Sequence, residues 1–192
     1  MIIKVCGMRE PQNIREVAAL AINWIGFIFY ERSKRFVERC PTEQQVTDSE
    51  QLSPKKVGVF VNATIESMME KASAYKLDYL QLHGNESPED CHTLQKRGYS
   101  LIKAFPIATK EDFEKTREYE GRVDYFLFDT RCEGYGGSGK RFDWSILTEY
   151  KGETPFLLGG GIRPENAEAI RNFRHPRLAG IVLNSGFEIE PG

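Results

Sequence analysis

The chain has 192 residues and a formal net charge of −2, because 26 Lys and Arg residues nearly balance 28 Asp and Glu residues. With 40% hydrophobic residues, this composition is typical of a globular domain and excludes collagen-like, disordered and disulfide-scaffold classes. It has no excess of basic residues of the kind that indicates binding to nucleic acid or to an anionic membrane. No apolar run approaches the roughly 18 residues of a membrane-spanning helix, and the start of the chain has no signal-peptide pattern, so we expect a cytoplasmic protein.

Short apolar runs recur along the chain at intervals of 21 to 32 residues, counted between their first residues. They are rich in Val, Ile, Phe and Leu and have the length of β-strands. The predicted strands are Ile2–Cys6, Trp24–Phe29, Lys56–Val61, Tyr79–His83, Ser100–Phe105, Val123–Asp129, Pro155–Leu158 and Ala179–Leu183. Such a regular spacing indicates repeated βα units rather than a sandwich.

Helix signals lie between these strands. Proline and acidic residues after a capping residue mark helix starts, and apolar residues at helical spacing mark a buried face. The predicted helical segments begin at Glu10-Pro11 (with Ile14, Val17, Ala18 and Ala21 on one face), at Thr64 (continuing from Ser67 to Ala74), at Ser87-Pro88 and at Pro164. The Gly-rich stretch 130–142 is predicted to be a long loop.

Eight such repeats predict a single (β/α)₈ barrel, the TIM barrel, over residues 1–192. A doubly wound open sheet is the alternative. After the eighth strand the chain ends at Glu190-Pro191-Gly192, with no residues for an eighth helix, and we expect that a C-terminal segment with the final helix is missing.

Four cysteines occur, at Cys6, Cys40, Cys91 and Cys132, and none belongs to a C-x-x-C pair. We therefore predict reduced thiols and neither a zinc ribbon nor a thioredoxin motif. Cys6 differs from the others because it ends a predicted strand, where barrel active sites lie. Side chains alternate along a strand, so Lys4 shares its face and would favour the thiolate that a base requires. The alternative is a buried apolar cysteine.

Asp129 ends the strongly apolar run Tyr-Phe-Leu-Phe-Asp. A carboxyl group beside hydrocarbon tends to keep its proton, as a general acid requires, although an aspartate at this position can also cap the following turn. A base and an acid facing each other are suited to moving a proton between neighbouring carbons. His83 either joins them or is a buried, hydrogen-bonded residue.

Glycine-rich segments follow the last three strands: Gly136-Gly137-Ser138-Gly139-Lys140, Gly159-Gly160-Gly161 and Asn184-Ser185-Gly186. The last two, in loops seven and eight, indicate a phosphate cradle of backbone amides, whereas the first is predicted to be a flexible lid. Arg35, after the second strand, can hold a carboxylate through two parallel hydrogen bonds; the alternative is a solvated loop arginine.

Several motifs in this order resemble the phosphoribosylanthranilate isomerase family. They are Lys-Val-Cys-Gly-Met-Arg (4–9), Phe-Tyr-Glu-Arg-Ser-Lys-Arg-Phe-Val (29–37), Gly-Val-Phe-Val-Asn (58–62), Leu-Gln-Leu-His-Gly (80–84), Phe-Asp-Thr (128–130) with Gly-Gly-Ser-Gly-Lys-Arg-Phe-Asp-Trp (136–144), Leu-Gly-Gly-Gly-Ile-Arg-Pro-Glu-Asn (158–166) and Asn-Ser-Gly-Phe-Glu (184–188). The resemblance implies an Amadori rearrangement in tryptophan biosynthesis, which turns an aminoaldose phosphate into an aminoketose phosphate.

The same resemblance implies roles for the residues that match. Asp129 would protonate the furanose ring oxygen, Cys6 would remove the C2 proton of the resulting Schiff base, and Arg35 would clamp the anthranilate carboxylate. The predicted substrate-binding set is Arg35, His83, Gly137, Ser138, Gly160, Gly161, Asn184, Ser185 and Gly186. The expected partner is a small phosphorylated substrate, with no metal or organic cofactor and with either a monomer or a homodimer.

Val182 departs from the family pattern, which usually has an aspartate two residues before the Asn or Ser of the eighth-strand motif. This departure leaves open a catalytically silent barrel that binds a phosphorylated ligand. A metal site built from Cys6, His83 and Asp129 is a further alternative, although no ligand spacing supports it.

Overall fold

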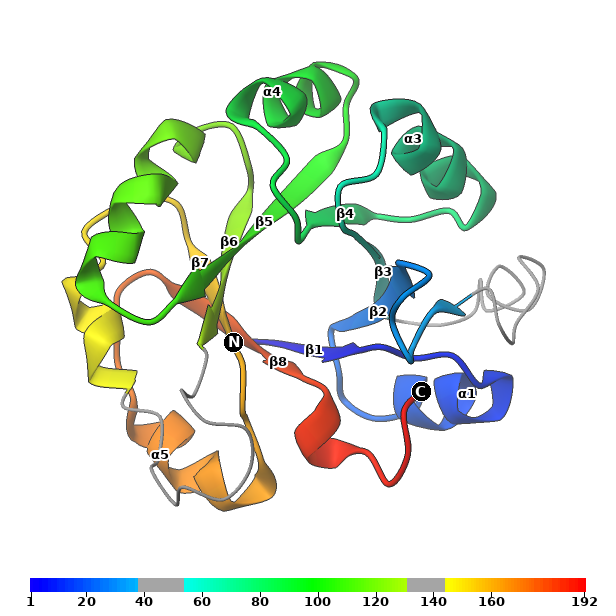
Figure 1. The fold of residues 1–192 in the computed structure, drawn as a ribbon. Helices are drawn as coiled ribbons and strands as arrows, with labels where there is room; N and C mark the ends of the chain where they lie inside the picture. Colours follow the sequence, from blue (N-terminus) through cyan, green and yellow to red (C-terminus); the bar gives the residue numbers. More distant parts are fainter. Residues whose placement is uncertain (38–53, 131–143) are drawn as a thin grey trace.

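A computed structural model describes residues 1–37, 54–130 and 144–192 of the chain. Its eight parallel strands form a closed barrel in which each strand pairs with the next and β8 pairs with β1 (Figure 1). The strands are β1 (Ile2–Cys6), β2 (Trp24–Phe29), β3 (Lys55–Phe60), β4 (Tyr79–Leu82), β5 (Ser100–Ile107), β6 (Tyr125–Thr130), β7 (Phe156–Gly159) and β8 (Leu178–Leu183). All eight predicted strands are present, with ends that differ by a few residues.

The first and last strands, β1 and β8, pair with each other and close the barrel. Lys4 of β1 lies opposite Val182 of β8, and Ile2 lies opposite Gly180. An open, doubly wound sheet would leave two edge strands, so this pairing excludes the alternative fold. The predicted (β/α)₈ barrel is confirmed.

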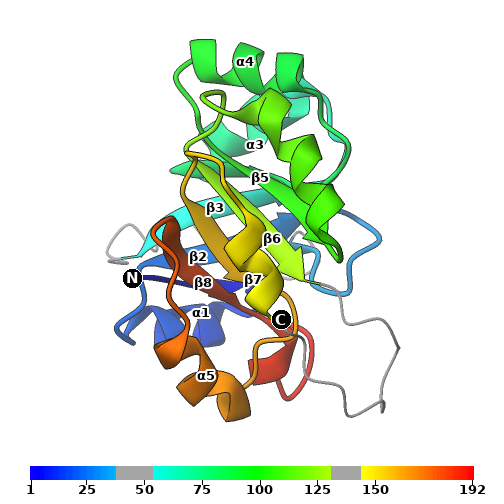
Figure 2. The same cartoon turned by 90° about the vertical axis from the view of Figure 1, so that its left-hand side faces the viewer.

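Helices cover the outside of the barrel (Figures 1 and 2). The described helical elements are α1 (Pro11–Ala18), α3 (Ile65–Ala74), α4 (Pro88–Lys96), the 3₁₀ helices η3 (Lys110–Tyr119), η4 (Trp144–Glu149) and η5 (Pro164–Asn166), then α5 (Ala167–Asn172) and η6 (Ser185–Phe187). The predicted caps of two helices are present: Thr64 accepts a hydrogen bond from Ser67, and Ser87 forms a capping box with Asp90. No described helix is long and apolar enough to cross a membrane.

Three features differ from the prediction. α1 ends at Ala18, so Ala21 lies outside it, where the chain turns back to pair Asn23 with Ile3. The η3 and η4 helices were not predicted, and each has buried residues three apart, such as Trp144 and Leu147, a spacing that suits a 3₁₀ helix. Of the predicted loop 130–142, Thr130 is the last residue of β6 and the rest lies outside the described residues.

Two apolar layers hold the fold, one between the strands and the helices and one inside the barrel. At the amino-terminal end of the strands, the rings of Trp24, Tyr79 and Tyr125 contact one another, with centroids 4.6 to 6.1 Å apart. These three rings fill the barrel interior at that end. The functional space therefore lies at the opposite end, where the strands lead into their following loops.

Candidate active site

A cavity of about 350 Å³ opens at the carboxyl ends of the strands. Every predicted site residue that the structure describes lines it, together with apolar residues of the barrel interior. The predicted residues on this cavity are Cys6, Arg35, His83, Asp129, Gly160, Gly161, Asn184, Ser185 and Gly186. Gly137 and Ser138 lie outside the described residues, as do Cys40 and Cys132. The topology thus brings together residues from almost the whole length of the chain.

Cys6 lies at the end of β1 with its side chain toward the barrel interior, above that of Lys4. It is a free thiol and only 6% exposed. Lys4 is fully buried, and this burial lowers the pKa of its ammonium, while the charge of the neighbouring Cys6 acts in the opposite direction. Both side chains lie against Gly26 of β2, where an added Cβ would come 2.7 Å from the Cys6 sulfur and 3.0 Å from Lys4 Cε. The predicted proximity of Lys4 and Cys6 is therefore present.

Asp129 reaches the cavity from the opposite side, at the end of β6. Its Oδ2 lies 3.5 Å from His83 Nε2, and both side chains are about one-third exposed. Phe126 and Phe128, which precede it in sequence, belong to the layer under the helices, so only Leu127 of that apolar run shares the cavity with Asp129. The hydrocarbon that the sequence places beside this carboxyl group thus faces mainly away from it.

Arg35 is held over the cavity by a carboxylate from the end of the chain. Its Nε lies 2.7 and 2.9 Å from the two Glu188 oxygens, and Nη2 also donates to Glu188. This bidentate pair raises the pKa of Arg35 and fixes the plane of its guanidinium. The side chain also passes over Gly7, whose φ of +88° favours glycine and where an added Cβ would come 2.5 Å from Arg35 Cδ.

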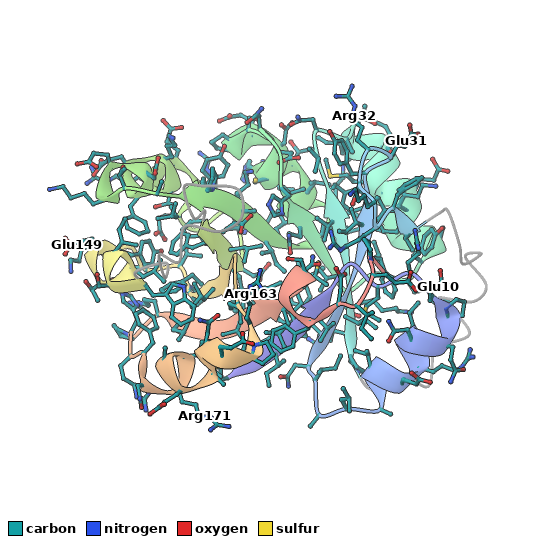
Figure 3. The ribbon with its side chains drawn as sticks, turned by 60° about the horizontal axis from the view of Figure 1, so that its bottom comes forward. Glu10, Glu31, Arg32, Glu149, Arg163 and Arg171 are labelled. Carbon is teal, nitrogen blue, oxygen red and sulfur yellow. The ribbon has the colours of Figure 1, made fainter. Side chains whose placement is uncertain are left out.

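The loops after β7 and β8 meet at the rim of the cavity. Gly160 and Gly161 have φ values of +81° and +64°, a conformation that other residues rarely adopt. Gly186 of η6 lies so close to the β7 loop that an added Cβ would come 2.1 Å from the Ile162 carbonyl and 2.9 Å from Arg163. Arg163 lies on the loop beside η6 (Figure 3). Two glycine-rich turns therefore present backbone to the same space, as a phosphate cradle requires.

Three residues at this site were not predicted from the sequence. Gln81 is a polar residue in an apolar strand, on the same strand face as His83, and that alternation could have identified it. Glu188 belongs to the motif 184–188 but was given no role. Gly26 offered only the general signal of a glycine inside a strand, which marks a close approach of another group.

Within residues 1–37, 54–130 and 144–192, no group of three or more His, Cys, Asp and Glu side chains is arranged to hold a metal ion. Cys6, His83 and Asp129 share the cavity without forming such a group.

Comparison with known proteins gives one consistent family. A family model described as N-(5'phosphoribosyl)anthranilate (PRA) isomerase matches residues 3–192. A Parabacteroides distasonis relative named N-(5'-phosphoribosyl)anthranilate isomerase is 97% identical over 192 residues, which are 100% of this chain and 87% of the relative.

Solved structures agree with this match. The crystal structure of phosphoribosyl anthranilate isomerase from Thermotoga maritima is similar with a TM-score of 0.83 at 32% identity, over 100% of this chain and 92% of that one. A phosphoribosyl anthranilate isomerase in complex with reduced 1-(o-carboxyphenylamino)-1-deoxyribulose 5-phosphate has a TM-score of 0.82 at 29% identity, over 100% and 91%.

Proposed function

Because the chain belongs to the N-(5'-phosphoribosyl)anthranilate isomerase family, we propose that Cys6 and Asp129 are the base and the acid of its reaction. The chain is an isomerase of tryptophan biosynthesis. Its reaction is the Amadori rearrangement of N-(5-phosphoribosyl)anthranilate to 1-(2-carboxyphenylamino)-1-deoxyribulose 5-phosphate.

The first step is opening of the ribose ring. Asp129 gives its proton to the furanose ring oxygen, the bond from that oxygen to C1 breaks, and the lone pair of the anthranilate nitrogen forms a C1=N bond. A carboxyl group at the half-buried end of β6 can both reach the substrate and release its proton.

The second step moves a proton from carbon. The Cys6 thiolate takes the C2 proton, and the electron pair of that C–H bond forms a C1=C2 double bond while the imine nitrogen accepts the displaced pair. The resulting enaminol becomes the ketone when C1 gains a proton and the C2 hydroxyl loses one. The Lys4 side chain lies directly below Cys6, against the same Gly26 of β2, and the two groups interact electrostatically.

Binding groups surround this pair. Arg35 holds the anthranilate carboxylate with the donors that Glu188 leaves available. Backbone amides around Gly160, Gly161, Ser185 and Gly186 hold the phosphate. Asn184 Oδ1 is buried and has no hydrogen-bond partner among the described residues, and it accepts from a substrate hydroxyl.

The observation that best supports these roles is the placement of Cys6 and Asp129 on one cavity, from strands β1 and β6, beside the two glycine turns. General acid–base groups contribute about 10²–10⁴-fold each, so Cys6→Ser and Asp129→Asn should each lower kcat by that factor. Turnover is followed by the loss of substrate fluorescence, and circular dichroism checks that each variant is folded.

Matched variants control for the chemistry of the changes. Asp124→Asn changes an exposed carboxylate that accepts from Leu101 near the other end of β6, and Cys91→Ala removes a thiol on the buried face of α4. Both should keep kcat within about twofold. Wild-type kcat in a folded Cys6→Ser or Asp129→Asn variant would overturn the assigned role of that residue.

A further inference from the structure

Four polar side chains form a continuous chain across the floor of the cavity. Lys4 Nζ donates to Gln81 Oε1, Gln81 Nε2 lies 3.0 Å from His83 Nδ1, and His83 Nε2 lies 3.5 Å from Asp129 Oδ2. This polar chain, Lys4–Gln81–His83–Asp129, runs from β1 through β4 to β6. The proposed reaction uses Asp129 as its acid and has Lys4 beside its base Cys6, so Gln81 and His83 need an explanation.

Lys4 and Gln81, the inner half of this polar chain, are buried, and burial of polar groups costs free energy. Lys4 is 0% exposed and Gln81 is 1% exposed, inside a barrel otherwise filled by apolar side chains. A protein tolerates buried polar groups when they are hydrogen-bonded. Replacing a buried, paired set of such groups by apolar residues often leaves the free energy of unfolding unchanged. Stability alone therefore does not account for Lys4 and Gln81.

Donor and acceptor roles give the polar chain a direction. An ammonium carries donors only, so the Gln81 atom that faces Lys4 is the carbonyl oxygen. The Gln81 amide nitrogen, which can only donate, therefore faces His83 Nδ1, and that ring nitrogen accepts. In a neutral imidazole whose Nδ1 accepts, the proton is on Nε2, the atom that faces Asp129.

We propose that Gln81 is a positioning residue that holds His83 in its Nε2-protonated tautomer, so that the ring donates to Oδ2 of Asp129. This inference rests on the proposed acid role of Asp129. The donated N–H would orient the carboxyl group, leaving Oδ1 for the substrate, and would stabilise the carboxylate that remains after the proton has left.

The test replaces the donor by an acceptor in the contact between residue 81 and His83. Gln81→Glu keeps the size of the side chain and a partner for Lys4, but its carboxylate can only accept, so His83 Nδ1 must then carry a proton. Nitrogen-15 spectra of the imidazole rings report the protonation of each nitrogen, and a His83→Gln variant assigns the His83 signals. We expect a neutral Nε2–H ring in the wild type and a protonated Nδ1 in Gln81→Glu. We also expect kcat to fall by about 10- to 100-fold, with KM within about threefold.

Gln95→Glu makes the same chemical change at an exposed position of α4 and should leave kcat unchanged. A second pair of variants does not depend on Gln81: a glutamine amide approximates His Nε2 and an asparagine amide approximates Nδ1, so His83→Gln should retain at least about tenfold more kcat than His83→Asn. Equal kcat in that pair would contradict the proposal.

A wild-type His83 protonated on Nδ1 at neutral pH would also overturn it, and so would a Gln81→Glu protein with wild-type tautomer and kcat. These outcomes are separate from failure of the proposed function. If Asp129→Asn abolishes turnover but Gln81→Glu does not change it, the acid role stands and the positioning role falls. If Asp129→Asn is fully active, the acid role falls, and the positioning role, which rests on it, falls with it.

Discussion

Gly26 of β2 leaves the space that the side chains of Cys6 and Lys4 occupy. An alanine methyl group there would lie 2.7 Å from the Cys6 sulfur, closer than van der Waals contact allows. The thiol must then shift from its present position, and misplacement of about 1 Å can cost up to 10²-fold in rate. We therefore expect Gly26→Ala to lower kcat by at least tenfold, measured in a steady-state fluorescence assay.

Gly58 of β3 provides the matched control for this prediction. It lies on the outer face of the barrel, where an added Cβ would come 2.4 Å from Leu77. Overpacking costs typically 1–3 kcal/mol, so Gly58→Ala should lower the free energy of unfolding while the folded enzyme keeps its kcat. A Gly26→Ala protein that loses stability but keeps kcat would show that crowding at Cys6 has no catalytic effect.

Val182 lies in the cavity wall where the family usually has an aspartate, and it is paired with Lys4 across β1 and β8. A carboxylate at this position would lie next to the buried Lys4 ammonium and could accept from substrate hydroxyls. Hydrogen bonds to charged groups contribute about 1.5–3 kcal/mol, so Val182→Asp should raise kcat/KM by about tenfold or more. Val182→Asn, which lacks the charge, is the control, and an equal gain in both variants would exclude an ionic effect.

At the scale of elements, strands were easier to predict than helices because each strand carries an apolar run between clear turn signals. Strand ends shifted by a few residues, since pairing partners decide them: β6 begins at Tyr125, and the side chain of Asp124 instead accepts from the backbone of Leu101. The η3 helix was missed because only Phe113 and Thr116 of its ten residues are buried, too few to give a periodic signal.

For the cavity residues, positions along a strand were predictable from the sequence, whereas contacts between strands were not. Alternation along β1 and β6 was sufficient to place Cys6 and Asp129 on the inner face at the strand ends. The contacts that they make could not be predicted, because Gln81 and Glu188 are brought to the site only by barrel closure and by the path of the last residues. A single sequence contains the periodicity of a strand but not the identity of its distant neighbours.

Lys103 and Glu86 form a buried ion pair that connects β5 to the segments after β3 and β4. Their side chains are each 3% exposed, Lys103 Nζ also donates to the Gly84 carbonyl, and Glu86 accepts from the backbone of Asn62 and Gly84. Removing one partner of a buried pair leaves an uncompensated charge and costs about 3–5 kcal/mol. We expect that loss in the free energy of unfolding of Lys103→Met, measured by urea denaturation.

The double variant Lys103→Met/Glu86→Gln tests the origin of this loss. It removes the carboxylate charge of Glu86 that Lys103→Met leaves unpaired, so its free energy of unfolding should be at least about 1 kcal/mol higher than that of Lys103→Met alone. A single variant that loses less than about 1 kcal/mol would indicate that the pair contributes no more than an exposed one.

At the scale of the whole molecule, the barrel connects distant parts of the chain at one rim. The last residues pass from β8 toward α1 (Figure 1), where the Gly192 carbonyl accepts from Glu10 and Glu188 holds Arg35. The loops after β1, β2 and β8 are therefore coupled at the cavity. Global unfolding and loss of the site should coincide in these parts of the structure.

Burial of neutral acids makes the stability of the whole molecule sensitive to alkaline pH. Cys91, on the buried face of α4, is 0% exposed, and burial raises its pKa to about 12, while burial also raises the pKa of Tyr119 to about 12. A raised pKa means that the stabilisation is complete below the pKa of the unfolded group, near 8.5 for a thiol, and is lost as the pH rises toward 12. Stability should therefore fall steadily above about pH 9.

The fully buried Cys91 thiol lowers the free energy of unfolding by about 1.4 kcal/mol per pH unit between its two pKa values. Cys91→Ala removes this group, so the free energy of unfolding of the variant should decline less steeply than that of the wild type by about this slope between pH 9 and pH 11. Urea denaturation at half-unit steps of pH measures both curves, each referred to its own value at pH 7 to remove the constant cost of the lost sulfur. Parallel curves would mean that the Cys91 thiol ionises as readily in the folded barrel as in the unfolded chain, which a fully buried side chain beside the carboxylates of Glu86 and Asp90 should prevent.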